Sequence, residues 1–248
     1  MSERGFKDHF SGHAADYAAH RPTYPPELFR LLAERAPARD LAWDAGTGSG
    51  QAALALAERF AAVVATDASP EQLAAAAPHP RVTFRVGRED GSGLAAGQAD
   101  LVTVAQALHW FDRPRFFAEV RRVLRPGGVL AVWCYAMART SPEVDAVVDA
   151  FYEDVVGPYW PPERGLVESG YAGIDLPFAR EPFPAQAMSL QLDLAGILGY
   201  VSTWSAYRRY LAARGDDPLP ALREALAPVW GPGRRRVVWP LSIQVGRT

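Results

Sequence analysis

Cysteine is nearly absent from this chain of 248 residues: Cys134 is the only one, so no disulfide can form within it. Proteins without disulfides are typical of a reducing compartment. Long apolar runs are missing too, since no stretch approaches the ~20 apolar residues that a membrane-spanning helix needs. The first ten residues carry charges in place of an apolar leader run (Glu3, Arg4, Lys7 and Asp8). We therefore expect a cytoplasmic protein without a membrane segment, in which Cys134 is a buried structural thiol.

An excess of charge of either sign is also missing. The chain has 26 Lys and Arg against 28 Asp and Glu, a net charge of −2, which gives no electrostatic reason to expect nucleic acid. The densest basic cluster, residues 234–236, is interpreted as a solvated turn, with a phosphate-binding patch as the alternative. No histidine, cysteine or carboxylate has metal-ligand spacing, so no metal is expected. We expect a small-molecule partner, no nucleic acid or membrane, and a monomer or homodimer.

What the chain does contain is a regular alternation of short apolar runs with helical runs. Strand-like runs occupy residues 41–44, 63–67, 82–86, 100–105 and 129–135, and helix-like runs occupy 50–60, 70–77 and 114–124. Two later strand-like runs occupy 189–194 and 237–245. Such alternation is typical of βαβ units. It predicts an α/β, Rossmann-like fold with a seven-stranded, mostly parallel sheet and one antiparallel strand near its edge.

The alternation of strand-like and helix-like runs ends after residue 136. One long helix is predicted at 142–156, then a stretch rich in proline, glycine and aromatic residues, then helices at 194–201, 204–213 and 219–229. We therefore interpret residues 1–248 as a single domain with four parts. N-terminal cover helices occupy residues 1–36, and a nucleotide-binding core occupies 37–136. A helical lid containing the sixth strand occupies 137–230, and a closing strand occupies 231–248.

The most informative motif is the glycine-rich turn at residues 44–50, which separates the first strand from the first core helix. A dinucleotide-binding turn has glycine at three fixed places, and Gln51 stands where the third should be. Asp44, two residues before Gly46, would also lie badly beside a pyrophosphate. A carboxylate there suits a ligand with an ammonium group, such as S-adenosylmethionine (SAM).

Ligands of open α/β sheets bind outside the carboxyl ends of the strands, where the strand order reverses. The residues at those ends are therefore the candidates for a site. They are Asp44, Gly46 and Gly48 after the first strand, Asp67 after the second, residues 87–90 after the third and residues 106–110 after the fourth.

These motifs, together with residues 124–128, resemble the class I SAM-dependent methyltransferases of the type 11 domain. Residues 17–25 and 201–207 further resemble the small-molecule branch that includes trans-aconitate methyltransferase-like proteins. The resemblance implies SAM as cofactor and S-adenosylhomocysteine (SAH) as product. It implies cofactor contacts from Tyr17, Arg21, Asp44, Ala45, Gly46, Thr47, Gly48, Asp67, Ala68, Glu89, Asp90 and Gln106.

Each implied cofactor role has a physical basis or an alternative. Asp44 would lie near the methionine ammonium group, and Ala68 near the adenine. Asp67 would accept both ribose hydroxyls; alternatively it caps a helix near Pro70, a role that Ser69 could also fill. Either Glu89 or Asp90 would accept from the adenine amino group, and the sequence does not choose between them. Arg21 could bind a carboxylate of cofactor or substrate, or simply cap the first helix.

The predicted substrate pocket contains Tyr24, His109, Trp110, Trp204 and Tyr207. His109 is the candidate catalytic residue, as a proton acceptor or substrate contact; the alternative is packing at a helix start. The aromatic residues Trp204 and Tyr207 have helical spacing, which is also common in a plain core.

The function predicted from these residues is methyl transfer from SAM to a small molecule. A carboxylate or a hydroxyl is the first candidate acceptor, and ring-carbon and amine acceptors are the alternatives. Catalysis would rest on positioning for an in-line displacement and not on a covalent intermediate. The alternatives are a non-catalytic SAM-binding protein and an NAD-dependent oxidoreductase. A basic residue beside the acceptor, such as Arg139 or Arg208, would indicate an acid substrate.

Overall fold

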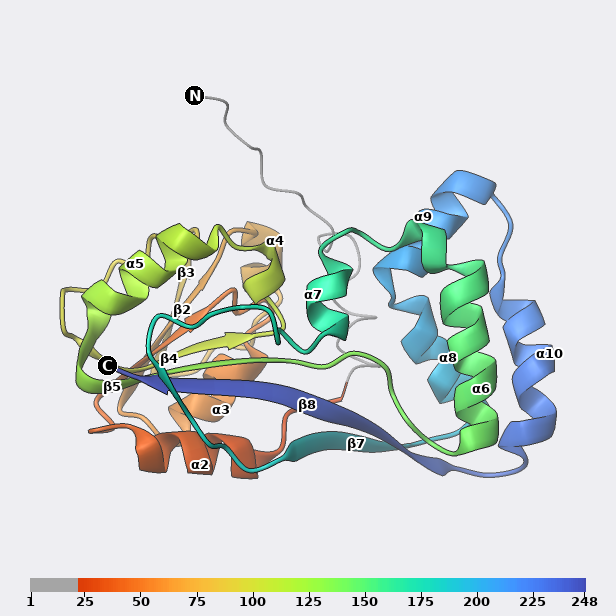
Figure 1. Cartoon of the computed structure of the whole chain (residues 1–248), viewed down its shortest axis with the longest axis horizontal. Coiled ribbons are helices and arrows are strands. Elements are labelled where there is room, and N and C mark those ends of the chain that lie inside the picture. Colours follow the sequence, from red (N-terminus) through yellow and green to blue (C-terminus); the bar gives the residue numbers. More distant parts are fainter. Residues whose placement is uncertain (1–21) are drawn as a thin grey trace.

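The computed structural model describes residues 22–248, which form a mixed sheet with helices on both faces and a group of helices beyond one end (Figure 1). Tyr17 and Arg21 lie outside the described residues. The strand order is β3 (Val82–Val86), β2 (Ala62–Asp67), β1 (Leu41–Ala45), β4 (Ala99–Ala105), β5 (Leu124–Cys134), β8 (Arg235–Arg247) and β6 (Ala179–Glu181). The first five strands are parallel, and β8 is antiparallel to both of its neighbours in this order. The α/β, Rossmann-like fold is therefore confirmed, with seven strands along the main path.

Helices cover both faces of the parallel part of the sheet, which explains why β1 is buried along its whole length. On one face lie α2 (Pro26–Arg35) and α3 (Gln51–Ala57), packed against Ala42 of β1. On the other lies α5 (Arg113–Val123), whose Phe116 ring centroid is 5.9 Å from that of Trp43. The short helix α4 (Pro70–Ala74) follows β2.

The strand order reverses between β1 and β4. From β1 the chain continues to β2 and β3 on one side, and β4 then returns to pair with the other side of β1. A crevice at the carboxyl ends of these two strands is the expected ligand site of such a sheet. β5 is longer than predicted because pairing begins at Leu124, before the glycine pair, with an irregular register at Ala99–Leu101.

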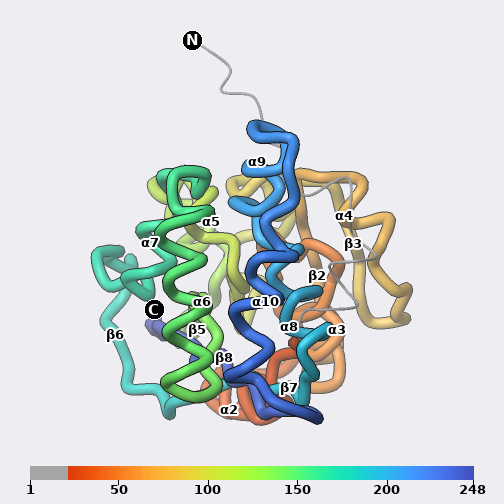
Figure 2. The backbone as a smooth tube through the Cα atoms, turned by 90° about the vertical axis from the view of Figure 1, so that its right-hand side faces the viewer, coloured from red at the N-terminus to blue at the C-terminus, as the bar shows by residue number. Residues whose placement is uncertain are grey.

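The lid consists of several helices at one end of the sheet (Figures 1 and 2). They are α6 (Pro142–Ala150), the π-helical turn η2 (Phe151–Val155), the 3-10 turn η3 (Gly157–Tyr159), α7 (Arg164–Glu168), α8 (Leu194–Ser202), α9 (Ser205–Arg214) and α10 (Leu219–Trp230). The predicted helix at 142–156 thus changes to π geometry after Ala150. Neither α7 nor β6 was predicted, because elements of five and three residues show no periodicity. Within residues 22–248, no helix has the length and apolarity needed to cross a bilayer.

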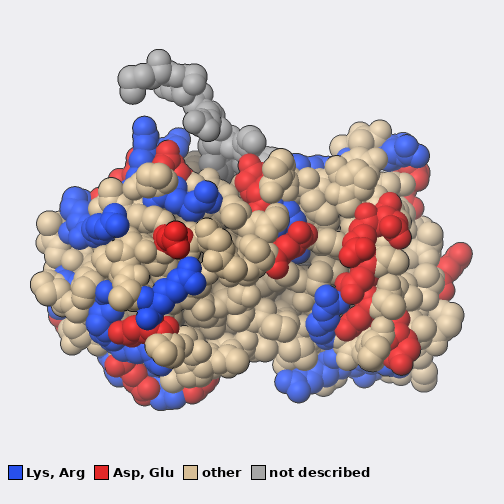
Figure 3. Space-filling model, viewed as in Figure 1, with Lys and Arg blue, Asp and Glu red and all other residues tan. Residues whose placement is uncertain are grey.

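One strand joins the lid to the sheet. The second half of β8 pairs with β5, while its first half pairs with β7 (Gln186–Leu192), off the main path. An isolated bridge between Arg139 and Val238 also ties the start of the lid to β8. Figure 3 shows basic and acidic side chains together on the face seen in Figure 1, with acidic groups gathered over the lid helices.

Candidate active site

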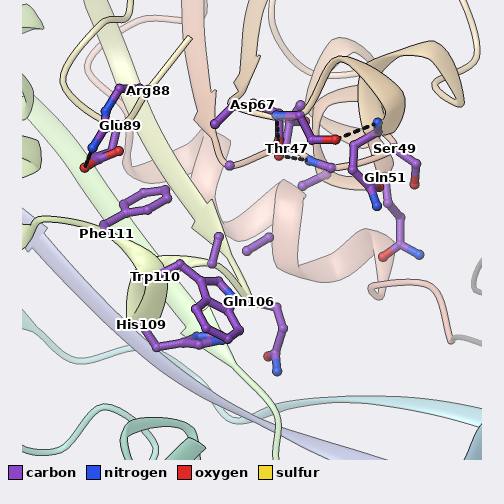
Figure 4. Close-up of a pocket in the computed structure, with 18 of the residues that line it drawn as sticks. Thr47, Ser49, Gln51, Asp67, Arg88, Glu89, Gln106, His109, Trp110 and Phe111 are labelled. Atoms are coloured by element: carbon purple, nitrogen blue, oxygen red, sulfur yellow. Dashed lines mark hydrogen bonds and ion pairs between the residues drawn. The ribbon is translucent and has the colours of Figure 1, made fainter. Parts of the chain in front are cut away.

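A cavity of about 1210 Å³ opens at the carboxyl ends of the parallel strands, at the reversal point of the sheet (Figure 4). Its lining comes from the turns after β1, β2, β3 and β4, from the chain before α2, and from α7. Ten of the predicted site residues line it: Tyr24, Gly46, Thr47, Gly48, Asp67, Ala68, Glu89, Gln106, His109 and Trp110. Asp44, Ala45, Asp90, Trp204 and Tyr207 are not part of this lining.

The glycine turn after β1 is a closely packed piece of left-handed backbone. Gly46, Gly48 and Gly50 have φ angles of 66°, 55° and 84°, a region that favours glycine. A Cβ on Gly46 would lie 2.7 Å from Cβ of Ala107. The carbonyl of Thr66 accepts from the N–H groups of Gly46 and Thr47, at 2.8 and 3.0 Å. The turn therefore presents bare backbone to the cavity in a fixed shape.

Asp44 lies beneath the cavity instead of in it. The residue is 0% exposed, and its two carboxylate oxygens accept from Thr47 Oγ1 at 2.5 Å and Thr103 Oγ1 at 2.7 Å. Burial raises its pKa to about 6, against the lowering effect of the two hydroxyl donors. The predicted contact of Asp44 with a ligand stays a prediction: in this structure the side chain is buried beneath the turn, and one hydroxyl donates to each of its oxygens. Asp44 holds the turn through Thr47, and Ala45 is also fully buried.

Asp67, the last residue of β2, faces the cavity and also stabilises the glycine turn. Its oxygens accept from the N–H groups of Gly48 at 2.8 Å and Ser69 at 2.9 Å. Burial raises its pKa, and these N–H groups oppose the shift. The cap of α4 is Ser69, whose hydroxyl accepts from Gln72 N, so Asp67 is not needed as a cap. Each carboxylate oxygen has a second lone pair and can accept one more hydrogen bond.

The structure separates Glu89 from Asp90. The Glu89 side chain lines the cavity, is 10% exposed, and accepts from Asp112 N at 3.1 Å. The Asp90 side chain is 34% exposed, lies outside the cavity lining, and is 3.7 Å from Arg115 Nη1. Glu89 is therefore the carboxylate positioned to contact a ligand.

The side chain of Gln106, directly after β4, makes two hydrogen bonds to the backbone of Tyr135, which directly follows β5. Its amide nitrogen donates to the carbonyl of Tyr135 at 3.2 Å, and its amide oxygen accepts from Tyr135 N at 2.8 Å. The backbone of Gln106 is left-handed, with a φ of 57°, which is unusual for a residue with a side chain. Strain of this kind is typical of functional sites, where the surroundings hold it in place.

His109, in the 3-10 turn η1 (Leu108–Trp110), is oriented by a tyrosine from the lid. Its Nδ1 lies 2.8 Å from the hydroxyl of Tyr171, a residue with a φ of 61° and 0% exposure. Burial lowers the pKa of His109 to about 4; the positive charge of Arg164 lowers it too, and Glu163 opposes both. The imidazole is therefore neutral near pH 7.

The neutral state of His109 predicts a pH effect on stability. Between pH 4 and pH 6.5 the unfolded chain binds a proton at this histidine and the folded chain does not, so this group makes stability rise with pH. Replacing it with glutamine (His109→Gln) should reduce the gain in the free energy of unfolding between about pH 5 and about pH 7.5, measured by urea denaturation. The raised pKa of Asp44 makes the free energy of unfolding fall as the pH rises, but this effect is the same in the parent protein and in His109→Gln. Identical pH dependence in the two proteins would show that His109 titrates normally when folded.

A second, smaller cavity of about 80 Å³ lies between the core and the lid. It shares Gln106, His109, Trp110 and Tyr135 with the first cavity. Its remaining lining comes from the lid and from the end of β5: Ala136, Trp160, Pro161, Arg164, Val167, Tyr200, Thr203, Trp204 and Ser205. The two cavities therefore meet at a common wall of four residues.

Of the predicted lid aromatics, only one reaches this second cavity. Trp204 lines it, whereas Tyr207 packs in α9, is 7% exposed, and donates its hydroxyl to Asp217 at 3.0 Å. The prediction that Tyr207 lines a pocket is thus not met, and its aromatic ring belongs to the core.

Comparison with known proteins decides the family. The sequence pattern of a methyltransferase domain matches residues 43–132. A methyltransferase from Dictyostelium discoideum is 34% identical over 225 residues, which cover 89% of this chain and 86% of that protein. The chain belongs to the class I SAM-dependent methyltransferases. The solved structure of a type II methyltransferase from Anaeromyxobacter dehalogenans is 46% identical, covers 92% of this chain and 97% of its own, and superposes with a TM-score of 0.87. An uncharacterized methyltransferase from Mycobacterium tuberculosis is 40% identical over 134 residues, 53% of this chain and 54% of its own.

SAM is the cofactor of this methyltransferase, and the residues of the larger cavity suit it. Asp67 retains acceptor capacity on both oxygens, which matches the two hydroxyls of a ribose. Glu89 offers a carboxylate for an adenine amino group, and the backbone of Gly46 and Gly48 lines the cavity where the methionine portion would lie. The NAD-dependent alternative is excluded by the family.

Sequence reasoning missed two residues of this methyltransferase site. Arg164 lines the second cavity, whereas the arginines considered beforehand, Arg139 and Arg208, line neither. Arg139 instead pairs with Asp149 at 2.8 Å. Tyr171, which orients His109, lies 62 residues away from it in the chain. Both lie in the stretch rich in proline, glycine and aromatic residues that follows the first lid helix, where no spacing signal marks them.

Proposed function

We propose that this methyltransferase methylates an oxygen of a small-molecule acceptor, either a carboxylate or a hydroxyl. The observation that carries the proposal is the second cavity, which is small, lined largely by residues of the lid, and shares Gln106, His109, Trp110 and Tyr135 with the cofactor cavity. Pockets for small molecules are typically about 300–1,000 Å³, so in this proposal the acceptor occupies the second cavity together with the adjoining part of the larger one.

Catalysis in this proposal is an in-line displacement that depends on positioning. The sulfonium of SAM supplies an activated methyl group, so no covalent enzyme intermediate is needed. Holding the reactants in line can supply ~7–11 kcal/mol of the barrier. Cys134, the one thiol of the chain, is buried, its pKa is raised to about 12 by burial, and it points to the carbonyl of Val167. A nucleophilic role for this thiol is therefore not part of the proposal.

The role proposed for His109 is to bind and orient the acceptor. With a pKa of about 4 it is a weak proton acceptor near pH 7. Its Nδ1 is engaged by Tyr171, so Nε2 is the nitrogen available to an acceptor. A carboxylate acceptor suits such a site because it has no proton to lose.

The test combines calorimetry with turnover. We expect SAH to bind, and methyl-labelled SAM to transfer its label to compounds in a fraction of small carboxylic and hydroxylated metabolites. Absence of SAH binding would overturn the proposal. SAH binding with no transfer to any metabolite would instead favour the alternative of a non-catalytic SAM-binding protein.

A further inference from the structure

We propose that the second cavity, of about 80 Å³, binds the carboxylate end of a flat carboxylic acid through Arg164, and that the rest of the molecule extends past His109 into the larger cavity, where the methyl acceptor lies. This inference rests on the proposed function and narrows its substrate to one chemical class. The carboxylate at Arg164 is an anchor in this proposal, and a second oxygen of the same molecule receives the methyl group.

The charge of the second cavity favours an anion. Among the described residues, Arg164 is the only charged side chain in its lining, since His109 is neutral. Only 15% of the Arg164 side chain is exposed, so water screens its charge little. No carboxylate of the described residues lines this cavity, and the ion-pair partner of Arg164, Glu168, lies outside the lining with a side chain that is 46% exposed. An anionic group of the ligand would add a second, more buried partner for the Arg164 charge.

The guanidinium of Arg164 is held so that one edge stays available. Its Cζ lies 4.5 Å from the ring centroid of Trp160 and 5.4 Å from that of Tyr152. Its Nε donates to the Tyr152 hydroxyl at 2.7 Å and lies 3.6 Å from Glu168, whose side chain is 46% exposed and also bonds to Tyr152. Within residues 22–248, the two terminal nitrogens have no hydrogen-bond partner.

A carboxylate fits the edge that remains. The two terminal nitrogens carry four N–H donors in a fixed plane, which matches the two oxygens of a carboxylate. Such charge-assisted pairs are about twice as strong as neutral hydrogen bonds. The rings of Trp160 and Tyr152 pack against each other, with centroids 4.9 Å apart, and both contact the guanidinium. These contacts hold the guanidinium in place before the ligand arrives, which reduces the entropy cost of binding.

The rest of the lining favours a flat ligand body. Five aromatic side chains surround the cavity: Trp110, Tyr135, Trp160, Tyr200 and Trp204. Aromatic rings pack well against other rings and conjugated groups, in stacked or edge-on arrangements. An aromatic or conjugated acid therefore suits the walls better than a flexible aliphatic acid.

The position of Arg164 assigns the two ends of the ligand. Arg164 lines only the second cavity, whereas His109 and Gln106 line both cavities. The atom that receives the methyl group must lie at the shared wall, so the anchored carboxylate lies away from it. In the transfer, a bond forms between the acceptor oxygen and the methyl carbon. The carbon–sulfur bond breaks with its electron pair on sulfur, and a hydroxyl acceptor releases its proton to water.

The test uses benzoate, trans-cinnamate and their primary amides as probes of the SAH-loaded protein, with binding followed by calorimetry. We expect both acids to bind at least about tenfold tighter than their amides, because the amides lack the charge. Arg164→Gln should weaken the acids by about tenfold or more while leaving amide and SAH affinities unchanged. Arg139→Gln is the matched control, an arginine of the lid that lines neither cavity, and should change nothing.

Several outcomes would overturn the inference. The inference would be wrong if the amides bound as well as the acids. It would also be wrong if the acids bound Arg164→Gln as well as they bind the parent protein, or if neither acid bound at all. Transfer of labelled methyl to cinnamate would also contradict it, because cinnamate has no oxygen other than its carboxylate. If the parent protein did not bind SAH, the proposed function itself would be wrong.

Discussion

Replacing Asp67 with alanine is expected to weaken SAH binding by about 100-fold or more. The variant would lose two hydrogen bonds from ribose to a charged carboxylate, each worth about 1.5–3 kcal/mol. It would also leave the N–H groups of Gly48 and Ser69 without the partners that now hold the glycine turn. Calorimetric titration with SAH measures the loss directly.

Two companion variants make this result interpretable. Asp90→Ala removes a neighbouring carboxylate that lies outside the cavity lining, and should bind SAH like the parent protein. Asp67→Asn preserves the size of the side chain, so a large loss in this variant cannot come from a cavity. An affinity of Asp67→Ala within about threefold of the parent, under 1 kcal/mol, would show that Asp67 does not hold the ribose.

Replacing Gly46 with alanine should destabilise the protein. The left-handed backbone costs about 1–2 kcal/mol for a residue with a Cβ. At Gly46 that Cβ would also lie 2.7 Å from Ala107 Cβ and 2.9 Å from Phe111 Cζ. Overpacking of this kind adds about 1–3 kcal/mol.

Gly97→Ala is the matched control, because Gly97 has a φ of 64° and no atom within 4 Å of a Cβ. It carries the backbone cost alone, so Gly46→Ala should be less stable than Gly97→Ala by about 1–3 kcal/mol in urea denaturation. Equal losses in the two variants would mean that the contacts with Ala107 and Phe111 relax freely.

The sequence was sufficient for the parallel half of the fold because each strand and helix there repeats one pattern several times. Strands at 63–67 and 82–86 were predicted within one residue of β2 and β3. Within the lid, α7 and β6 were not predicted, because they are too short to show a period. Their conformation depends on β8 and the core, which lie far away in the chain.

The cofactor site was predictable to the level of the strand ends but not to individual side chains. Asp44 and Asp67 both end strands, yet one is buried beneath the turn and the other faces the cavity. Thr103, on a neighbouring strand, takes one oxygen of Asp44, and only the register of β1 with β4 reveals that contact. Likewise, Glu89 and Asp90 are adjacent in the chain, yet only Glu89 lines the cavity. The course of the loop, which the sequence does not reveal, decides which of the two side chains faces inward.

The proposed acceptor site was the least predictable part because its residues come from distant segments. His109 depends on Tyr171, and Arg164 depends on Tyr152 and Trp160. None of these pairs has a spacing that a helix or strand period would mark. Their roles follow from tertiary contacts alone.

The unbroken strand β8 limits how an acceptor can enter. Because one half of this strand pairs with β5 and the other with β7, the base of the lid is fastened to the sheet by continuous backbone hydrogen bonds. Swinging the whole lid away as one piece would require bending β8 or breaking that ladder. Entry and exit of an acceptor should therefore depend on local shifts of the lid helices. Crosslinking α7 to η1, which leaves β8 unchanged, should slow turnover.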